Sequence, residues 1–244
     1  VGCSLNCHFC ATAKLKRMRN LNPDEIYDQV VEIDKQSQLY YNRPLTNIVF
    51  MGMGEPLMNH KNTLTAIEKI ISVDGLGMSP KRITVSTSGI TKIIREISDQ
   101  NPKFKLAVSL HSAIERTRNR LMPFTKTFPL DQLLEALKYW YKKTKSKVTF
   151  EVVVWKDIND KQLDIDALVA YCNQVPSKVN LIEYNAIGDV QFAQARPEAI
   201  SAYTTALENN RISVTVRRSR GKDIDAACGQ LANKKNEFTN GQDV

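Results

Sequence analysis

Three cysteines near the start of the chain have the spacing of a metal-binding loop. They are Cys3, Cys7 and Cys10. A loop this short brings three thiolates toward one point. A closed structural metal site usually takes four protein ligands, whereas an iron-sulfur cluster held by three cysteines leaves one iron open for another ligand. The triplet therefore predicts a reactive iron-sulfur cluster rather than a structural metal site.

A zinc site is the alternative for the same loop. His8 would then serve as the fourth ligand beside the three thiolates. Because His8 directly follows Cys7 in the chain, its ring would have to bend back into the same coordination sphere. The spacing therefore favours the cluster over zinc.

A thiol near the other end of the chain has the surroundings of a nucleophile. Cys228 is flanked by the small residues Ala227 and Gly229, and it follows a basic run. That run consists of Arg217, Arg218, Arg220 and Lys222. Small neighbours leave a thiol accessible, and nearby cations favour the thiolate. The same cations can hold RNA phosphates while the thiol meets a base, although a solvated surface strand also explains them.

The remaining cysteine, Cys172, shows a different pattern. It shares a helical stripe with Ile165, Leu168 and Val169. An apolar stripe of this kind normally faces a protein core. We therefore expect Cys172 to pack in the core and to take no part in chemistry.

Short polar residues and glycines follow four of the expected strands. They occupy residues 52–56, 86–89 and 109–111, together with Asn185. Each group alone also fits a simple explanation, since Gly-x-Gly forms tight turns and a lone His is usually a structural hydrogen-bonding group. Four such groups at one end of a parallel sheet are typical of a site for a polar cofactor.

The elements that position these residues alternate between strands and helices. The expected strands are residues 47–50, 82–86, 106–110, 148–155, 179–184 and 212–217. The expected helices are one that starts at Asn22-Pro23-Asp24-Glu25, and residues 60–72, 92–99, 130–141, 161–174 and 197–209. Strands separated by helices indicate βαβ units and a parallel sheet. With a further strand before the cluster loop, the fold class is α/β, a partial (βα)6 TIM-like barrel whose site lies at the carboxyl ends of the strands.

Length and composition fit one soluble domain of this kind. The chain has 244 residues, with 34 Lys and Arg against 26 Asp and Glu and a net charge of +8, which permits a phosphate-rich partner. The chain has only five cysteines and no signal peptide, which argues against a secreted protein held by disulfides. It has no long apolar run, which argues against a membrane protein. We expect a cytoplasmic monomer. Residues 1–232 would form the core, and residues 233–244 a disordered tail.

The motifs, taken in order, resemble one family, the dual-specificity RNA methyltransferases of the radical S-adenosylmethionine (SAM) superfamily. They are Gly2-Cys3 with Cys7 and Cys10, Arg19-Asn20-Leu21, Phe50-Met51-Gly52-Met53-Gly54-Glu55-Pro56, Ser86-Thr87-Ser88-Gly89, Ser109-Leu110-His111, Leu121-Met122-Pro123, Val179-Asn180-Leu181-Ile182 with Asn185, and Arg218-Ser219-Arg220-Gly221 leading into residues 223–231. The resemblance covers residues 1–231, which is nearly the whole chain.

The resemblance implies a set of site residues and cofactors. Cys3, Cys7 and Cys10 would hold a [4Fe-4S] cluster, and Cys228 would carry a methyl group. SAM would be bound by Gly54, Glu55, Ser86, Ser109, Leu110, His111 and Asn185. The family uses SAM twice per turnover to methylate C2 of an adenosine in 23S rRNA and in some tRNAs. An electron donor such as a flavodoxin system would reduce the cluster.

The resemblance also defines the alternatives. A sister group methylates C8 of the same adenosine, but Pro56 and the Arg218-Ser219-Arg220-Gly221 stretch favour the C2 enzyme. A non-catalytic iron-sulfur or zinc RNA-binding domain is a further possibility, although such a protein should have lost Cys228 or a cluster cysteine. The family carries a second reactive cysteine and a small accessory domain before the cluster loop. Because this sequence lacks them, we expect the chain alone to stall at the protein-RNA adduct or earlier.

Overall fold

Six parallel strands form the centre of the fold. The computed structural model describes residues 1–15, 17–187, 191–218 and 229–230. The strands are β1 (Ile48–Phe50), β2 (Ile83–Thr87), β3 (Lys105–Ser109), β4 (Val148–Val154), β5 (Ser177–Glu183) and β6 (Ser213–Arg217). Their order in the sheet follows their order in the chain, which leaves β1 and β6 as edge strands. The expected α/β fold with a parallel sheet is therefore confirmed.

The central strands are apolar because both faces of the sheet are covered. All seven residues of β4 are buried, and they pair with β5 in continuous register from Val148 and Ser177 to Val154 and Glu183. A continuous run of apolar, mostly β-branched residues is typical of a strand buried on both faces. The carboxyl ends of the two edge strands approach each other, since Nη1 of Arg217 lies 4.0 Å from Sδ of Met51, next to β1. The sheet thus curves as in a partial barrel.

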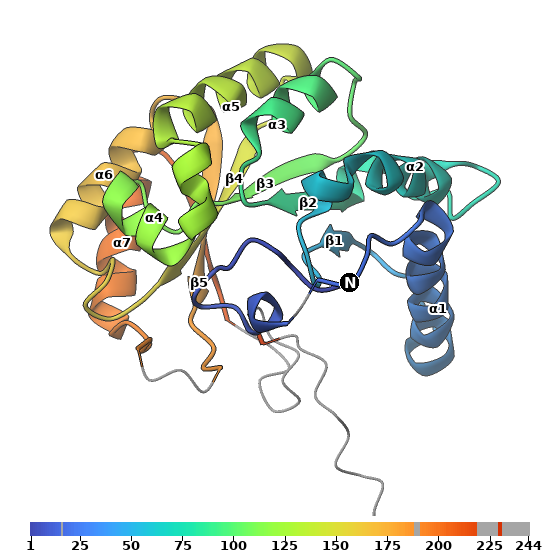
Figure 1. Ribbon diagram of the computed structural model, residues 1–244, viewed down its shortest axis with the longest axis horizontal. Helices are drawn as coiled ribbons and strands as arrows, with labels where there is room; N and C mark the ends of the chain where they lie inside the picture. Colours follow the sequence, from blue (N-terminus) through green and yellow to red (C-terminus); the bar gives the residue numbers. More distant parts are fainter. Residues whose placement is uncertain (16, 188–190, 219–228, 231–244) are drawn as a thin grey trace, which may run out of the picture.

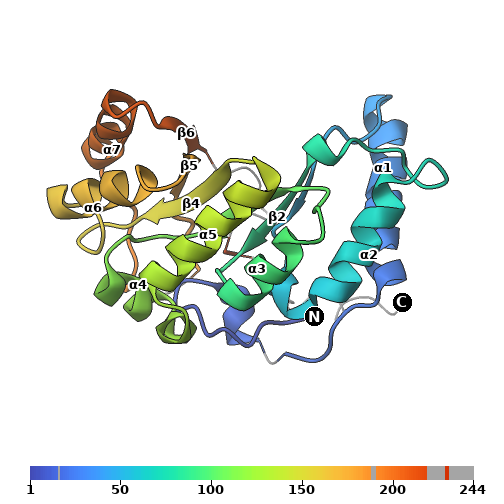
Figure 2. The same cartoon turned by 90° about the horizontal axis from the view of Figure 1, so that it is seen from above.

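Helices form an arc around the sheet (Figures 1 and 2). They are α1 (Pro23–Tyr41), α2 (His60–Ile71), α3 (Thr91–Ser98), α4 (Glu115–Leu121), α5 (Leu130–Thr144), α6 (Gln162–Cys172) and α7 (Pro197–Asn209). Helix α1 packs against α2, α3 against α5, and α6 against α7. The chain before α1, dark blue in Figure 1, runs across the side that this arc leaves open. None of the described helices is long and apolar enough to cross a membrane.

The six strands and six helices expected from the sequence are present, with ends that differ by at most three residues from the expected ones. Helix α4 was not predicted, because its sequence Glu-Arg-Thr-Arg-Asn-Arg-Leu has no apolar stripe that marks a helix. Strand β2 continues to Thr87, one residue beyond the expected end, because Thr87 is buried and pairs with Val108. The expected tail at residues 233–244 lies outside the described residues. Cys172 packs in the main core with Ile165, as predicted.

Helix α1 begins where its capping residues predict. The side chain of Asn22 accepts from the backbone N–H of Glu25, and the Glu25 carboxylate accepts from the backbone N–H of Asn22. This reciprocal pair is a capping box, and Pro23 follows it in the first turn. Arg19 also donates to both carboxylate oxygens of Glu25, at 2.5 and 2.7 Å. The segment after the cluster loop is thereby tied to the start of α1.

This arrangement predicts an unusually acidic Glu25. The hydrogen bond from Arg19, followed by that from Asn22, lowers the pKa of Glu25 from 4.5 to about 2. The ionised Glu25 therefore makes its full contribution to the free energy of unfolding above pH 4.5, and this contribution is lost as the pH falls through about 2. An NMR titration of the side-chain carboxyl carbons should show this midpoint. R19Q should move the midpoint back toward 4.5, and an unchanged midpoint in R19Q would contradict this assignment.

Candidate functional site

A cavity of about 540 Å³ lies at the carboxyl ends of the strands. It brings together residues that the sequence analysis assigned to two different ligands. The cluster cysteines Cys3, Cys7 and Cys10 line it together with Gly54, Glu55, Ser86, Ser109, His111 and Asn185. Leu110 is the exception, since its side chain is fully buried in the main core. Its backbone groups are also engaged, since its N–H donates to the carbonyl of Glu151 and its carbonyl accepts from Ser112 and Arg118.

The cysteine loop is held by backbone hydrogen bonds on both sides. The N–H of His8 donates to the carbonyl of Leu121, at the end of α4, over 3.0 Å. The N–H of Ala11 donates to the carbonyl of Gly229 over 2.8 Å. The aromatic ring of Phe9 contacts the ring of His111 edge-on, with centroids 4.7 Å apart. These contacts fix the loop between α4 and the end of β3.

The three thiols influence one another electrostatically. Burial raises the pKa of Cys7, and the neighbouring thiols of Cys10 and Cys3 raise it further, while the charge of Arg118 opposes the rise. Burial likewise raises the pKa of Cys3, and Cys10 adds to it. Within the described residues no three His, Cys, Asp or Glu side chains are arranged around a single metal ion. All three thiols nevertheless line one cavity, and three cysteine thiolates are the type of donor set that holds an iron-sulfur cluster.

Glu55 connects two strand ends inside the cavity. Its Oε1 accepts from the N–H of Leu57 over 3.0 Å, and its Oε2 accepts from the N–H of Ser88 over 2.7 Å. Burial raises the pKa of this carboxyl, and the hydrogen bonds from Ser88 and Leu57 oppose the rise. The carboxylate therefore fixes the turn after β1 to the loop after β2.

The backbone beside Glu55 requires a glycine. Gly54 has φ of +144°, and a Cβ there would lie 3.3 Å from the carbonyl oxygen of Gly2. The turn after β1 thus lies close to the backbone of the cluster loop. A larger residue would strain this contact and separate the two segments.

His111 is a neutral hydrogen-bonding residue in this site. Its Nδ1 accepts from the N–H of Val153 over 3.2 Å. Burial, and then the charge of Arg118, lowers the pKa of His111 to about 3. The backbone of His111 has φ of +58°, a left-handed conformation that the surrounding bonds must stabilise. The ring therefore presents its Nε2 side as the donor.

Asn159 holds the end of β4 and was not identified from the sequence. Its Nδ2 donates to the carbonyls of His111 and Val153 over 2.7 and 2.8 Å, and its Oδ1 accepts from the N–H of Trp155 over 2.8 Å. Its side chain is fully buried. The sequence signal for this role is weak, since Asn in a polar loop after a strand is common.

We expect N159A to destabilise the fold by ~3–5 kcal/mol, because it leaves three buried backbone groups without partners. Chemical denaturation followed by circular dichroism measures this loss. N173A is the matched control, since Asn173 is exposed, and it should stay within about 0.5 kcal/mol of the wild type. Equal stability of the two variants would contradict the role of Asn159.

Glu151 is a second residue that the sequence analysis missed. It lies within the apolar strand β4 and lines the cavity, with only 3% of its surface exposed. Its Oε1 accepts from Asn180 over 2.8 Å, and its Oε2 lies 3.7 Å from Nη1 of Arg217. Burial raises the pKa of Glu151, and Asn180 and then Arg217 oppose the rise. The presence of a carboxylate in an otherwise largely apolar strand could have identified Glu151 as a site residue.

The predicted methyl carrier, Cys228, lies outside the described residues. Its chain neighbour Gly229 lines the cavity and is bonded to Ala11 of the cluster loop. Arg217 and Arg218, the first two members of the basic run, line the same cavity. Asn185 is buried there as well. The described residues on each side of the Cys228 segment therefore meet at this cavity.

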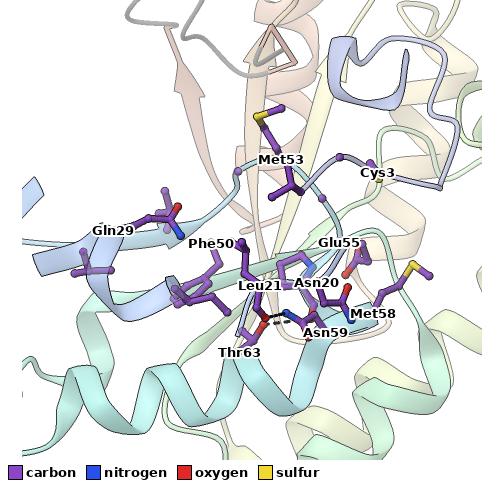
Figure 3. Close-up of a pocket in the computed structure, with 18 of the residues that line it drawn as sticks. Cys3, Asn20, Leu21, Gln29, Phe50, Met53, Glu55, Met58, Asn59 and Thr63 are labelled. Carbon is purple, nitrogen blue, oxygen red and sulfur yellow. Dashed lines mark hydrogen bonds between the residues drawn. The ribbon is translucent and has the colours of Figure 1, made fainter. Parts of the chain in front are cut away.

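A neighbouring cavity of about 430 Å³ shares Cys3, Gly54 and Glu55 with the first. Figure 3 shows it between Gln29 of α1 and the turn that carries Met53 and Glu55. Its floor is fixed by Asn59, whose Nδ2 donates to the carbonyl of Leu21 over 2.8 Å. Glu55 and Cys3 thus belong to a wall between two cavities.

The profile of the radical SAM superfamily matches residues 1–169. A probable dual-specificity RNA methyltransferase RlmN of Flavobacterium psychrophilum is 68% identical over 235 residues, which cover 96% of this chain and 68% of that protein. A protein of the same name from Christiangramia forsetii is 68% identical over 234 residues, covering 96% of this chain and 66% of that protein. This chain thus spans about two thirds of the length of these relatives.

A solved structure agrees with these relatives. The crystal structure of a radical SAM methyltransferase from Sphaerobacter thermophilus superimposes with a TM-score of 0.91 at 36% identity, covering 94% of this chain and 67% of that chain. Membership of the radical SAM superfamily implies a [4Fe-4S] cluster and the use of SAM. The chain therefore belongs to the dual-specificity RNA methyltransferase family of the radical SAM superfamily.

Proposed function

We propose that this chain is the catalytic core of an enzyme that methylates C2 of an adenosine in 23S rRNA, and in some tRNAs, through a methyl group carried on Cys228. One observation supports the proposal most directly. The three cluster cysteines, six of the seven residues expected to bind SAM and the residue that follows Cys228 all line one cavity. Membership of the RNA methyltransferase family supports the same reaction.

Cys3, Cys7 and Cys10 would hold the cluster, which leaves one iron free to bind SAM. When bound and reduced, the cluster supplies the electron that cleaves SAM to a 5′-deoxyadenosyl radical. An electron donor such as a flavodoxin system would reduce it. Gly54, Glu55, Ser86, Ser109, His111 and Asn185, which line the cavity, would hold SAM. The neutral ring of His111 and the bonded carboxylate of Glu55 would orient polar groups of SAM without any change in their own positions.

A thiol is needed because C2 of adenine is an electrophilic amidine carbon, to which a methyl cation cannot be delivered directly. The Cys228 thiolate would attack the methyl carbon of one SAM, forming an S–CH3 bond and releasing S-adenosylhomocysteine. Loss of a hydrogen atom from this methyl group, at the expense of a second SAM, would give a carbon that can add to C2. Cys228 would thus carry the transferred carbon throughout. Each turnover would use two SAM molecules.

Arg217 and Arg218 would hold RNA at the mouth of the cavity. Both line it, and the Arg217 guanidinium is held beside Glu151 and Met51 at one edge of the sheet. Guanidinium groups bind phosphate well because their N–H donors match its oxygens. The positive net charge of the chain would further attract the RNA phosphates, and this attraction should weaken as the salt concentration rises.

The test reconstitutes the protein anaerobically and supplies SAM, a reductant and an rRNA fragment. Peptide mass analysis should find S-methyl-Cys228 together with 5′-deoxyadenosine, and digestion of the protein-RNA adduct should place the linking carbon at C2 of the adenosine. C228A should still form deoxyadenosine but transfer no carbon, whereas C172A should behave as the wild type. Modification at C8 would assign the chain to the sister reaction. An unmodified Cys228 beside abundant deoxyadenosine would overturn the methyl-carrier role.

A further inference from the structure

Arg118 is a buried cation behind the cavity wall. It lies on α4, and only 1% of its surface is exposed. Its Nη1 donates to the carbonyls of Ser109 and Leu110, and its Nη2 donates to the carbonyl of Ser88 over 2.7 Å. Its Nε hydrogen has no partner within the described residues. One side chain therefore holds the carboxyl ends of both β2 and β3.

Two of the three acceptors, Ser109 and Leu110, are themselves among the residues expected to bind SAM. Ser88 also donates its N–H to Glu55, while Ser109 and Leu110 precede His111. A continuous set of bonds thus runs from Glu55 through Ser88 and Arg118 to the end of β3. Gly89 permits this approach, since a Cβ there would lie 3.4 Å from Nη2 of Arg118.

The helix that carries Arg118 also holds the cluster loop. The carbonyl of Leu121, the last residue of α4, accepts from the N–H of His8 over 3.0 Å. Leu121 packs in an apolar cluster that includes Cys7 and Phe9. Helix α4 therefore contacts the cluster loop with its end and the two strand ends with the Arg118 side chain.

The charge of Arg118 acts on this region as well. Burial lowers the pKa of Arg118 to about 10, so the guanidinium stays protonated at neutral pH. Its hydrogen-bond acceptors are neutral carbonyls, which orient the charge without cancelling it. The helix that carries this charge ends against the cluster loop, where Leu121 is bonded to His8 and packs beside Cys7. A fixed positive charge near a cluster favours its more negative, reduced form.

We propose that Arg118 is a positioning residue of the SAM site: it fixes the ends of β2 and β3 against the cluster loop and supplies a positive charge to the cluster. This inference rests on the proposed use of cluster and SAM. A guanidinium is required because only a planar fork reaches carbonyls on two strands at once. Lysine would keep the positive charge but lose the planar set of N–H donors, and methionine would lose both.

The test measures two properties of the anaerobically reconstituted protein besides activity. They are the dissociation constant for SAM and the reduction potential of the cluster, the latter by electron paramagnetic resonance of the reduced state. R118K should weaken SAM binding by ~10–100-fold and leave the potential near that of the wild type. R118M should weaken SAM binding similarly and lower the potential. R120M is the matched control, since Arg120 is exposed on the same helix, and both properties should stay at wild-type values.

The outcomes separate this inference from the proposed function. If the wild type binds neither cluster nor SAM, the proposed function itself fails. If the wild type binds both, and folded R118M matches it in affinity and potential, the role of Arg118 is wrong. Circular dichroism establishes folding, and R118K provides the test if R118M does not fold, because an unchanged SAM affinity in R118K would also contradict positioning. If Arg118 had only a structural role, R118K and R118M would both have a lower melting temperature, but their clusters would have the same reduction potential.

Discussion

C7S should abolish cluster binding while leaving the protein folded. Cys7 is one of three thiols on the cavity wall, and serine provides a poor ligand for iron in place of a thiolate. Iron and sulfide contents after reconstitution should fall to background, and 5′-deoxyadenosine formation should fall by at least about a hundredfold. Cys7 packs only at the edge of the smaller apolar cluster, so the cost in stability should be about 1 kcal/mol.

C172S is the matched control, because Cys172 is a thiol of the main core. A hydroxyl there is buried among apolar groups, which should lower stability by ~1–3 kcal/mol. The cluster should nevertheless load normally. The two substitutions therefore separate the two kinds of thiol: one loses the cluster and the other loses stability. Wild-type iron and sulfide contents in C7S would show that Cys7 is not a ligand.

The sheet was largely predictable from the sequence because its central strands are mostly apolar and β-branched. The run Val148–Val154 shows this, since five of its seven residues are apolar and all seven are buried. Helix α4 was not predictable, because its only two buried residues are Arg118 and Leu121. Its position depends on hydrogen bonds to distant carbonyls and not on an apolar stripe. Periodicity contains no information on such contacts.

The candidate site was predictable where residues follow strands directly. Parallel strands bring their carboxyl ends to one edge, and Glu55, Ser86 and Ser109 accordingly line the same cavity. Asn159 and Glu151 were missed for different reasons. Asn159 acts on backbone groups up to 48 positions away in the chain, and Glu151 is a single acidic residue inside an apolar run. Neither type of role has a local sequence signal.

E55A should both destabilise the fold and weaken SAM binding. Each oxygen of Glu55 accepts from one backbone N–H, so alanine leaves the donors of Leu57 and Ser88 without partners. Each N–H group that is left without an acceptor costs about 1–3 kcal/mol, which predicts a loss of ~2–6 kcal/mol in the free energy of unfolding. Because the same bonds join the turn after β1 to the loop after β2, SAM affinity should fall by ~10–100-fold.

E55Q tests whether the hydrogen bonds or only the shape of the side chain matter. Its carbonyl oxygen can accept one of the two bonds, while its amide hydrogens face the other N–H. The loss of stability should therefore be about half that of E55A, at ~1–3 kcal/mol. E68Q is the control, since Glu68 is exposed on α2, and it should change neither stability nor SAM affinity. If E55Q were as stable as the wild type and bound SAM as tightly, the carboxylate could not be what joins the turn after β1 to the loop after β2.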